Sequence, residues 1–224
     1  MRKILLIVSA TFAGLSYAQI TKGSVYIGGQ IGYSQKENKN THAKEENINI
    51  LPVAGFFVSN NLAAGAGVGY VNRKSKTVTP FYSPSASGIV ISETRRSALV
   101  INPFVRKYWS LSDKLYFFGE LEIPMEFGKV ETEESASNIS NPVSGAHPIN
   151  LPLSDEANYT SAGVNIKPGL DYFLNKNWTI EASIGEFGYS TSKLDVDGAK
   201  SVANSKFGLD LSAVTISVKY VFNK

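Results

Sequence analysis

The sequence contains no cysteine, so neither disulfides nor thiolate metal sites support the fold. It contains two histidines, His42 and His147, and any histidine-based catalysis has to use one of them. A glycine-rich phosphate loop, a nucleophile elbow and a cysteine–histidine cluster are also lacking. We therefore expect no enzyme activity, no cofactor and no bound metal.

Long hydrophobic runs are scarce as well. At the amino end, two positive charges precede an apolar run at residues 4–15, and small residues follow it. This pattern predicts a signal peptide at 1–18, cleavage before Gln19 and a single domain at 19–224. The run is too short for a membrane-spanning helix, and no later stretch reaches the roughly 18 apolar residues that such a helix needs.

An excess of one charge sign is lacking too. Removal of residues 1–18 takes away two of the 22 basic side chains and leaves 20 against 19 acidic ones, a net charge of +1. This balance gives no electrostatic reason to bind nucleic acid, and we expect no such partner.

Strand alternation is what the chain has in abundance. In residues 213–222, Val214, Ile216 and Val218 alternate with Thr215 and Ser217. Ten alternating residues suffice to cross a bilayer at a tilt. Because a strand without a partner leaves an open sheet edge, we predict that this strand pairs with residues 25–33 and closes a barrel.

Eight stretches alternate in this way. They lie at 25–33, 48–58, 62–71, 97–109, 115–127, 159–174, 178–189 and 207–222. Near Glu186 the alternation loses its phase, which indicates a β-bulge. We predict an all-β fold: an eight-stranded, antiparallel, up-and-down transmembrane barrel.

The predicted connections alternate between short and long. Three turns of a few residues, at 59–61, 110–114 and 175–177, separate four polar segments. We expect the segments 36–46, 72–96, 128–158 and 190–206 to be loops, although Gly88–Ser92 could extend a strand. Short turns on one side and long loops on the other are typical of outer-membrane barrels.

The two faces of the strands differ in character. Aromatic residues of the apolar row lie near strand ends, as in the interfacial girdles of membrane barrels, whereas the opposite row carries mid-strand charges. We predict a lumen charge network of Arg106, Glu120, Glu122, Lys167 and Glu181. These charges could line a pore, but an interior of eight strands is about filled by side chains, so we favour a paired plug.

Several segments together resemble a known family. They are PFVRKYW (103–109), LYFFGELEI (115–123), KPGLDYFL (167–174), NWTIEASIG (177–185) and the terminal YVF (220–222). With the signal peptide and eight strands, they resemble the outer-membrane β-barrel domain family of Gram-negative bacteria, in its small eight-stranded form. The resemblance implies the cell outer membrane as location, with outer-membrane lipid and lipopolysaccharide as surroundings.

The terminal strand also resembles the recognition signal for the barrel-assembly machinery. Ser217, Tyr220 and Phe222 match that signal, whereas Asn223 and Lys224 depart from it because they follow the last aromatic residue. The resemblance implies this machinery as a partner, and we expect a monomer.

Function is left open among several classes. We favour a structural or surface-interaction role through external loops that contact an outside ligand or a host surface. A small porin-like channel is the first alternative. A lipid A-modifying enzyme that uses His147 with a nearby serine or carboxylate is the second, and a soluble lipid-binding barrel is the third.

Overall fold

The computed structural model describes residues 20–82, 87–140, 153–184, 186–208 and 213–222. Within these ranges every regular element is a β-strand, and no helix is long and apolar enough to cross a membrane. The strands are β1 (Val25–Asn38), β2 (Ala43–Ser59), β3 (Leu62–Tyr82), β4 (Ser87–Ser110), β5 (Leu115–Glu122), β6 (Met125–Ser140), β7 (Leu153–Phe173), β8 (Trp178–Ile184), β9 (Glu186–Leu194), β10 (Val202–Gly208) and β11 (Ala213–Phe222).

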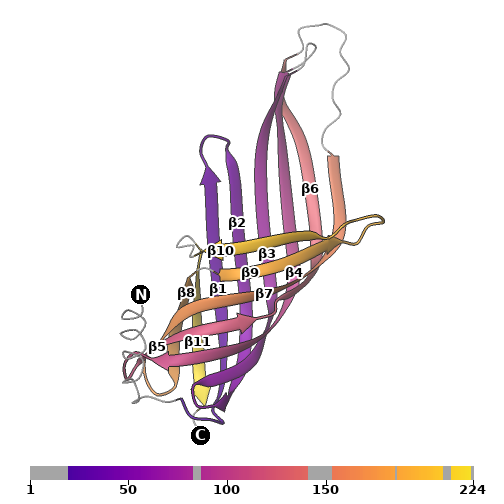
Figure 1. Ribbon diagram of the computed structural model, residues 1–224. Coiled ribbons are helices and arrows are strands. Elements are labelled where there is room, and N and C mark those ends of the chain that lie inside the picture. Colours follow the sequence, from indigo (N-terminus) through magenta and orange to yellow (C-terminus); the bar gives the residue numbers. More distant parts are fainter. Residues whose placement is uncertain (1–19, 83–86, 141–152, 185, 209–212, 223–224) are drawn as a thin grey trace, which may run out of the picture.

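The sheet closes on itself (Figure 1). Each strand pairs antiparallel with its neighbours, and β1 pairs with β2 on one side and with β11 on the other. The closing register runs from Val25↔Phe222 to Ser34↔Ala213. Three barrel strands are each made of two consecutive segments, namely β5 with β6, β8 with β9, and β10 with β11. The eleven segments therefore make eight barrel strands. The predicted antiparallel barrel and its closing pair are confirmed.

Two of the interruptions have local causes. Between β5 and β6 the register with β7 is unbroken, and Pro124 has no N–H to donate to the ladder. Between β8 and β9, Ser183 pairs with Gly169 while Phe187 pairs with Ile166, so one strand holds an extra residue. This is the bulge that the loss of phase near Glu186 predicts.

The apolar row faces outward. Ile31 is 63% exposed, whereas its neighbour Gln30 on the other face is only 7% exposed. The same alternation continues around the barrel, and the exposed apolar side chains include Ile27, Ile50, Val68, Leu99, Val105, Leu121, Val164, Ile166, Leu170, Ile180, Ile216 and Val218. A continuous apolar outer surface is what a bilayer requires of a spanning barrel.

Aromatic side chains border this apolar surface at two levels. At the end with short turns they are Phe56, Trp109, Phe117, Tyr172, Trp178, Tyr220 and Phe222, and at the end with long hairpins they are Tyr33, Tyr70, Phe127 and Tyr189. Tyr and Trp favour the two membrane–water interfaces, so the belts mark the boundaries of the spanning region. On β1 this region covers Val25 to Tyr33, about the length of one transmembrane strand.

The lumen near the short turns holds an aromatic core. Tyr26, Phe57 and Tyr108 are at most 1% exposed. The centre of the Phe57 ring lies 5.8 Å from that of Tyr26 and 5.6 Å from that of Tyr108. Ile20 joins this core, because its backbone N–H donates to Asn61 Oδ1 at 2.8 Å and its carbonyl accepts from Asn61 N. This end of the barrel is therefore closed by apolar packing.

The prediction of irregular polar loops was largely wrong, although the possible strand extension at Gly88–Ser92 is confirmed as part of β4. β3 continues to Tyr82 and β4 begins at Ser87, while β6 and β7 fill most of 128–158 and parts of 190–206 form β9 and β10. Figure 1 shows β3, β4 and β6 extending well beyond the rest of the barrel. Both of their faces meet water, so they need no apolar row, and hydrophobic alternation could not reveal them.

Candidate functional site

The centre of the lumen contains an ion-paired cluster. Arg106 Nη2 lies 2.6 Å from Glu120 Oε2, and Arg106 also forms an ion pair with Glu181. All three side chains are only 2% exposed. The structure therefore brings together three of the five charges that the sequence placed in the lumen, on three different strands: β4, β5 and β8.

Two further charged residues complete this cluster. Lys219 Nζ lies 2.8 Å from Asp171 Oδ2 and 2.5 Å from Glu181 Oε1, and it donates to the Tyr108 hydroxyl at 2.9 Å. Lys219 is 1% exposed, so it lies in the closed part of the lumen and not at its mouth. Strand alternation places Lys219 and Asp171 on the inward row, and that signal could have found them both.

Glu122 and Lys167 form the outer layer of the cluster. Lys167 Nζ is 2.7 Å from Glu122 Oε1, and the side-chain amides of Asn102 and Asn165 donate to the same carboxylate at 2.7 and 2.9 Å. Glu122 is 1% exposed but Lys167 is 19% exposed. Lys167 therefore marks the level at which water reaches the lumen. We call Arg106, Glu120, Glu122, Lys167, Asp171, Glu181 and Lys219 the lumen network.

Aromatic rings hold the buried cations from the side. The Arg106 guanidinium lies 4.3 Å from the centre of the Phe118 ring, and Lys219 Nζ lies 4.9 Å from the centre of the Tyr26 ring. Such contacts favour a cation that has lost its water. Phe118 fits because Gly169 has no side chain: a Cβ there would lie 2.3 Å from Phe118 Cζ.

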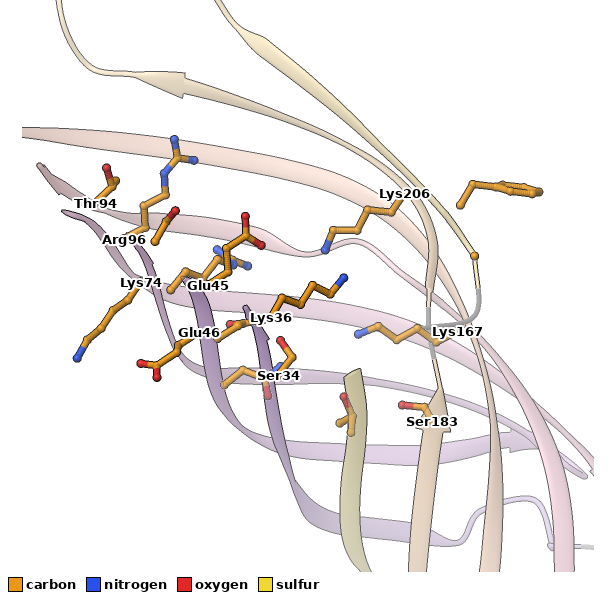
Figure 2. Close-up of a pocket in the computed structure, with 17 residues that line it drawn as sticks. Ser34, Lys36, Glu45, Glu46, Lys74, Thr94, Arg96, Lys167, Ser183 and Lys206 are labelled. Carbon is orange, nitrogen blue, oxygen red and sulfur yellow. The ribbon is translucent and has the colours of Figure 1, made fainter. Parts of the chain in front are cut away.

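Above the lumen network the barrel opens into a cavity of about 790 Å³, which we call the outer vestibule (Figure 2). Its wall is polar and contains six basic and two acidic side chains. They are Lys36, Arg73, Lys74, Arg96, Lys167 and Lys206, with Glu45 and Glu46. A cavity of about 390 Å³ continues inward, shares Asn47, Asn49 and Arg73 with the vestibule, and reaches Asn102 and Glu122.

A second ionic cluster stands in the wall of the vestibule. Arg73 donates to both carboxylate oxygens of Glu126 at 2.7 and 2.6 Å, and the Tyr159 hydroxyl donates to Glu126 at 3.1 Å. The Arg96 guanidinium lies 5.8 Å from the centre of the Tyr159 ring. The sequence did not predict this cluster, because Arg73 and Arg96 fall in a segment that was expected to be a loop.

Ion pairs also cross-link the long external strands. Lys76 Nζ lies 2.8 Å from Glu93 Oε1 on the neighbouring strand, and Arg95 pairs with Glu131 at 3.7 Å. The hydrogen bond from Lys76 lowers the pKa of the Glu93 carboxyl below its usual range. These pairs are exposed, so each one adds little to stability by itself.

The three residues of the predicted assembly signal lie on β11. Ser217 is buried in the lumen at 5% exposure, whereas Phe222 is 48% exposed on the outer surface. The Tyr220 ring packs edge-on against Trp178 at 5.1 Å and against Phe222 at 4.8 Å. Both aromatic residues thus belong to the belt at the short-turn end.

The predicted enzyme candidates are not brought together by any described contact. His42 is exposed in the turn between β1 and β2, where its φ is 54°, and His147 lies outside the described residues. In the described part of the chain, no group of three or more His, Asp or Glu side chains is arranged to hold a metal ion.

No family model matches the chain, and no curated protein matches it either. The chain is similar to several solved structures of bacterial proteins, among them the following three. The outer membrane protein OprG from Pseudomonas aeruginosa is 11% identical over 91% of this chain and 98% of its own, with a TM-score of 0.44. Neisserial surface protein A is 15% identical over 90% and 100%, with a TM-score of 0.40. The N-terminal β-barrel domain of P. aeruginosa OprF is 12% identical over 90% and 98%, with a TM-score of 0.39. The strand pairing within this chain by itself establishes the barrel fold.

Proposed function

We propose that this chain is an integral outer-membrane protein of a Gram-negative bacterium, with a plugged lumen and a structural or surface-interaction role. The observation that carries the proposal is the filled centre of the barrel. Arg106, Glu181 and Lys219 are at most 2% exposed, and both cations pair with Glu181 across the lumen. Because charged side chains that line an aqueous channel stay hydrated, this burial favours a plug over a pore.

The outer surface supports the membrane location. A closed sheet satisfies its backbone hydrogen bonds internally, as hydrocarbon demands, and here the apolar outer row lies between two aromatic belts. Short turns in such barrels face the periplasm and long connections face outward. The extended strands of β3, β4, β6 and β7 would then stand outside the cell.

The terminal strand supports a role for the barrel-assembly machinery. Tyr220 and Phe222 lie on the outer surface of β11, beside Trp178, at the end that would face the periplasm. We propose that they form the recognition signal together with Ser217, and that residues 1–18 direct export of the precursor.

Planar-bilayer conductance tests the plug directly. Refolded wild-type protein is expected to give no large, stable open steps, because the lumen network and the aromatic core fill the barrel. The variant R106A/Y108A removes the centre of the plug and serves as the positive control, provided that it still shifts on a gel after boiling. Large, stable steps from the wild type would overturn the proposal.

A porin-like channel is the second candidate, and the depth of the water-accessible space favours it. The outer vestibule and the adjoining cavity reach Glu122 and Asn102 in the interior of the barrel. The lumen network and the aromatic core then separate this space from the opposite end. The same conductance measurement decides between the two candidates.

A lipid A-modifying activity is testable separately. We propose that the protein is not an enzyme, so H42A and H147A are each expected to leave the lipid A profile of the cell unchanged. A changed profile in either variant, at unchanged protein level, would support the enzyme alternative.

A further inference from the structure

We infer that the outer vestibule is a binding site for a phosphorylated or sulfated sugar. This inference rests on the proposed surface-interaction role and adds the chemical class of the ligand. Figure 2 shows the side chains of Lys36, Lys167 and Lys206 extending into one cavity from different strands. At about 790 Å³, this cavity falls within the usual size range of small-molecule sites, about 300–1,000 Å³.

Basic side chains outnumber acidic ones around the vestibule. Arg73 pairs with Glu126, and Lys167 pairs with Glu122 at the floor. Even with these two carboxylates added to Glu45 and Glu46, the six basic residues of the wall exceed the acidic ones by two. Because polar walls concentrate this charge around a recess, an anion gains more there than on a flat surface.

The cavity also presents hydrogen-bond acceptors that an anion alone cannot use. The side-chain oxygens of Asn47, Asn49 and Asn102 are buried and have no hydrogen-bond partner. All three residues line the inner cavity, and Asn47 and Asn49 line the outer vestibule as well. An unsatisfied buried acceptor is costly, and a hydroxyl group that donates to it removes that cost.

These two features together select the ligand class. Phosphate or sulfate esters match the lysine and arginine side chains, and sugar hydroxyls match the amide oxygens and the hydroxyl-bearing wall. The wall supplies Ser34, Ser75, Thr94, Ser183 and Thr215 for further hydrogen bonds. A simple inorganic anion would use the charges but leave the amide oxygens unpaired.

Calorimetric titration of the refolded full-length mature chain tests the inference. A polyoxyethylene detergent avoids a competing sugar headgroup. Two arms distinguish the source of the ligand: a phosphorylated core oligosaccharide from deacylated lipopolysaccharide, and a free sulfated disaccharide. Maltose and inorganic phosphate are the controls for an uncharged sugar and a plain anion. Either anionic sugar is expected to bind, more weakly as salt rises, and the tighter arm identifies the source.

Variants locate the binding in the vestibule. K36Q/K206Q is expected to lower the affinity for the anionic sugar about tenfold or more, because each lysine is a charged hydrogen-bond donor. K193Q is the matched control, since Lys193 is exposed on β9 and lies outside both cavity linings. N47A is expected to weaken sugar binding about 2–10-fold through the lost amide acceptor.

Three results would overturn the inference. They are absence of binding in both arms, equal affinity of K36Q/K206Q and K193Q, and inorganic phosphate that binds as tightly as the anionic sugar. Conductance does not enter this test. A conducting wild type would overturn the plug, whereas failed titrations in a non-conducting, correctly folded protein would overturn only the ligand class.

Discussion

Glu181 joins the two buried cations of the lumen. It pairs with Arg106 on one side and with Lys219 on the other, and each cation also has a second carboxylate, Glu120 or Asp171. In a dry interior the loss of one partner leaves the opposite charge buried without a counter-charge, so the members of this group depend on one another. The arrangement explains how a barrel that meets lipid outside can hold charges inside.

Neutralising Arg106 tests this dependence. R106M is expected to lower the free energy of unfolding by about 3–5 kcal/mol, because it leaves the Glu120 carboxylate buried without its cation. Reversible urea unfolding in lipid vesicles measures the change through the fluorescence of Trp109 and Trp178. The double variant R106M/E120Q should recover part of the loss. A loss below about 1 kcal/mol in R106M would contradict the paired network.

At the scale of elements, the long strands distinguish this barrel from one with irregular loops. β3 pairs with β2 and β4 over most of its length, and β4 pairs with β6 up to Ser87. Backbone pairing on both sides makes these segments resistant to local opening, although their side chains are polar.

Limited trypsin digestion tests whether these segments are stably paired strands. In the folded protein, cleavage after Lys39 and Lys200, which lie between strands, is expected well before cleavage after Lys76 and Arg95. A protease needs several residues of extended, unpaired backbone, and the paired strands do not offer them. Mass spectrometry at early times identifies the cuts, and boiled protein is the control. Early cleavage after Lys76 would indicate a loop.

The closing strand pair makes a second prediction at this scale. Deletion of Tyr220–Lys224 removes three closing pairs and the buried Val221, so the shortened chain is expected not to assemble. Deletion of Asn223 and Lys224 alone keeps all three pairs and should assemble like the full chain. Gel mobility with and without boiling, on isolated membranes, reports assembly. Normal insertion of the longer deletion would overturn the role of closure.

The whole molecule divides into a spanning barrel and an extension beyond the outer aromatic belt. Residues 72–82, 87–96, 128–140 and 153–158 form the extension, which we call the external paddle (Figure 1). Its charges pair across strands, whereas the lumen network lies within the barrel below it. The two parts thus have separate sources of stability.

Removing the paddle tests this separation. Replacement of 75–94 and of 132–155 by Asn-Gly turns joins residues that already pair, Lys74 with Arg95 and Glu131 with Glu156. Such two-residue turns suit antiparallel strands. The shortened protein is expected to insert and to shift on boiling like the full chain, while losing any surface interaction that the paddle carries. Failure to insert would show that the paddle is needed for the barrel to form.

The sequence by itself determined the barrel strands, their inward and outward faces, the closing pair and the bulge, because lipid outside and packed side chains inside impose a period of two. It also predicted Arg106, Glu120, Glu122, Lys167 and Glu181 on the lumen side. Only the tertiary structure decided which charges pair, since Lys219 meets Asp171 and Glu181 from a strand that is far from them in the chain. It also decided that the polar segments form strands and enclose the outer vestibule. Strands in water on both faces need no apolar period, so their pairing is decided by neighbours and not by their own pattern.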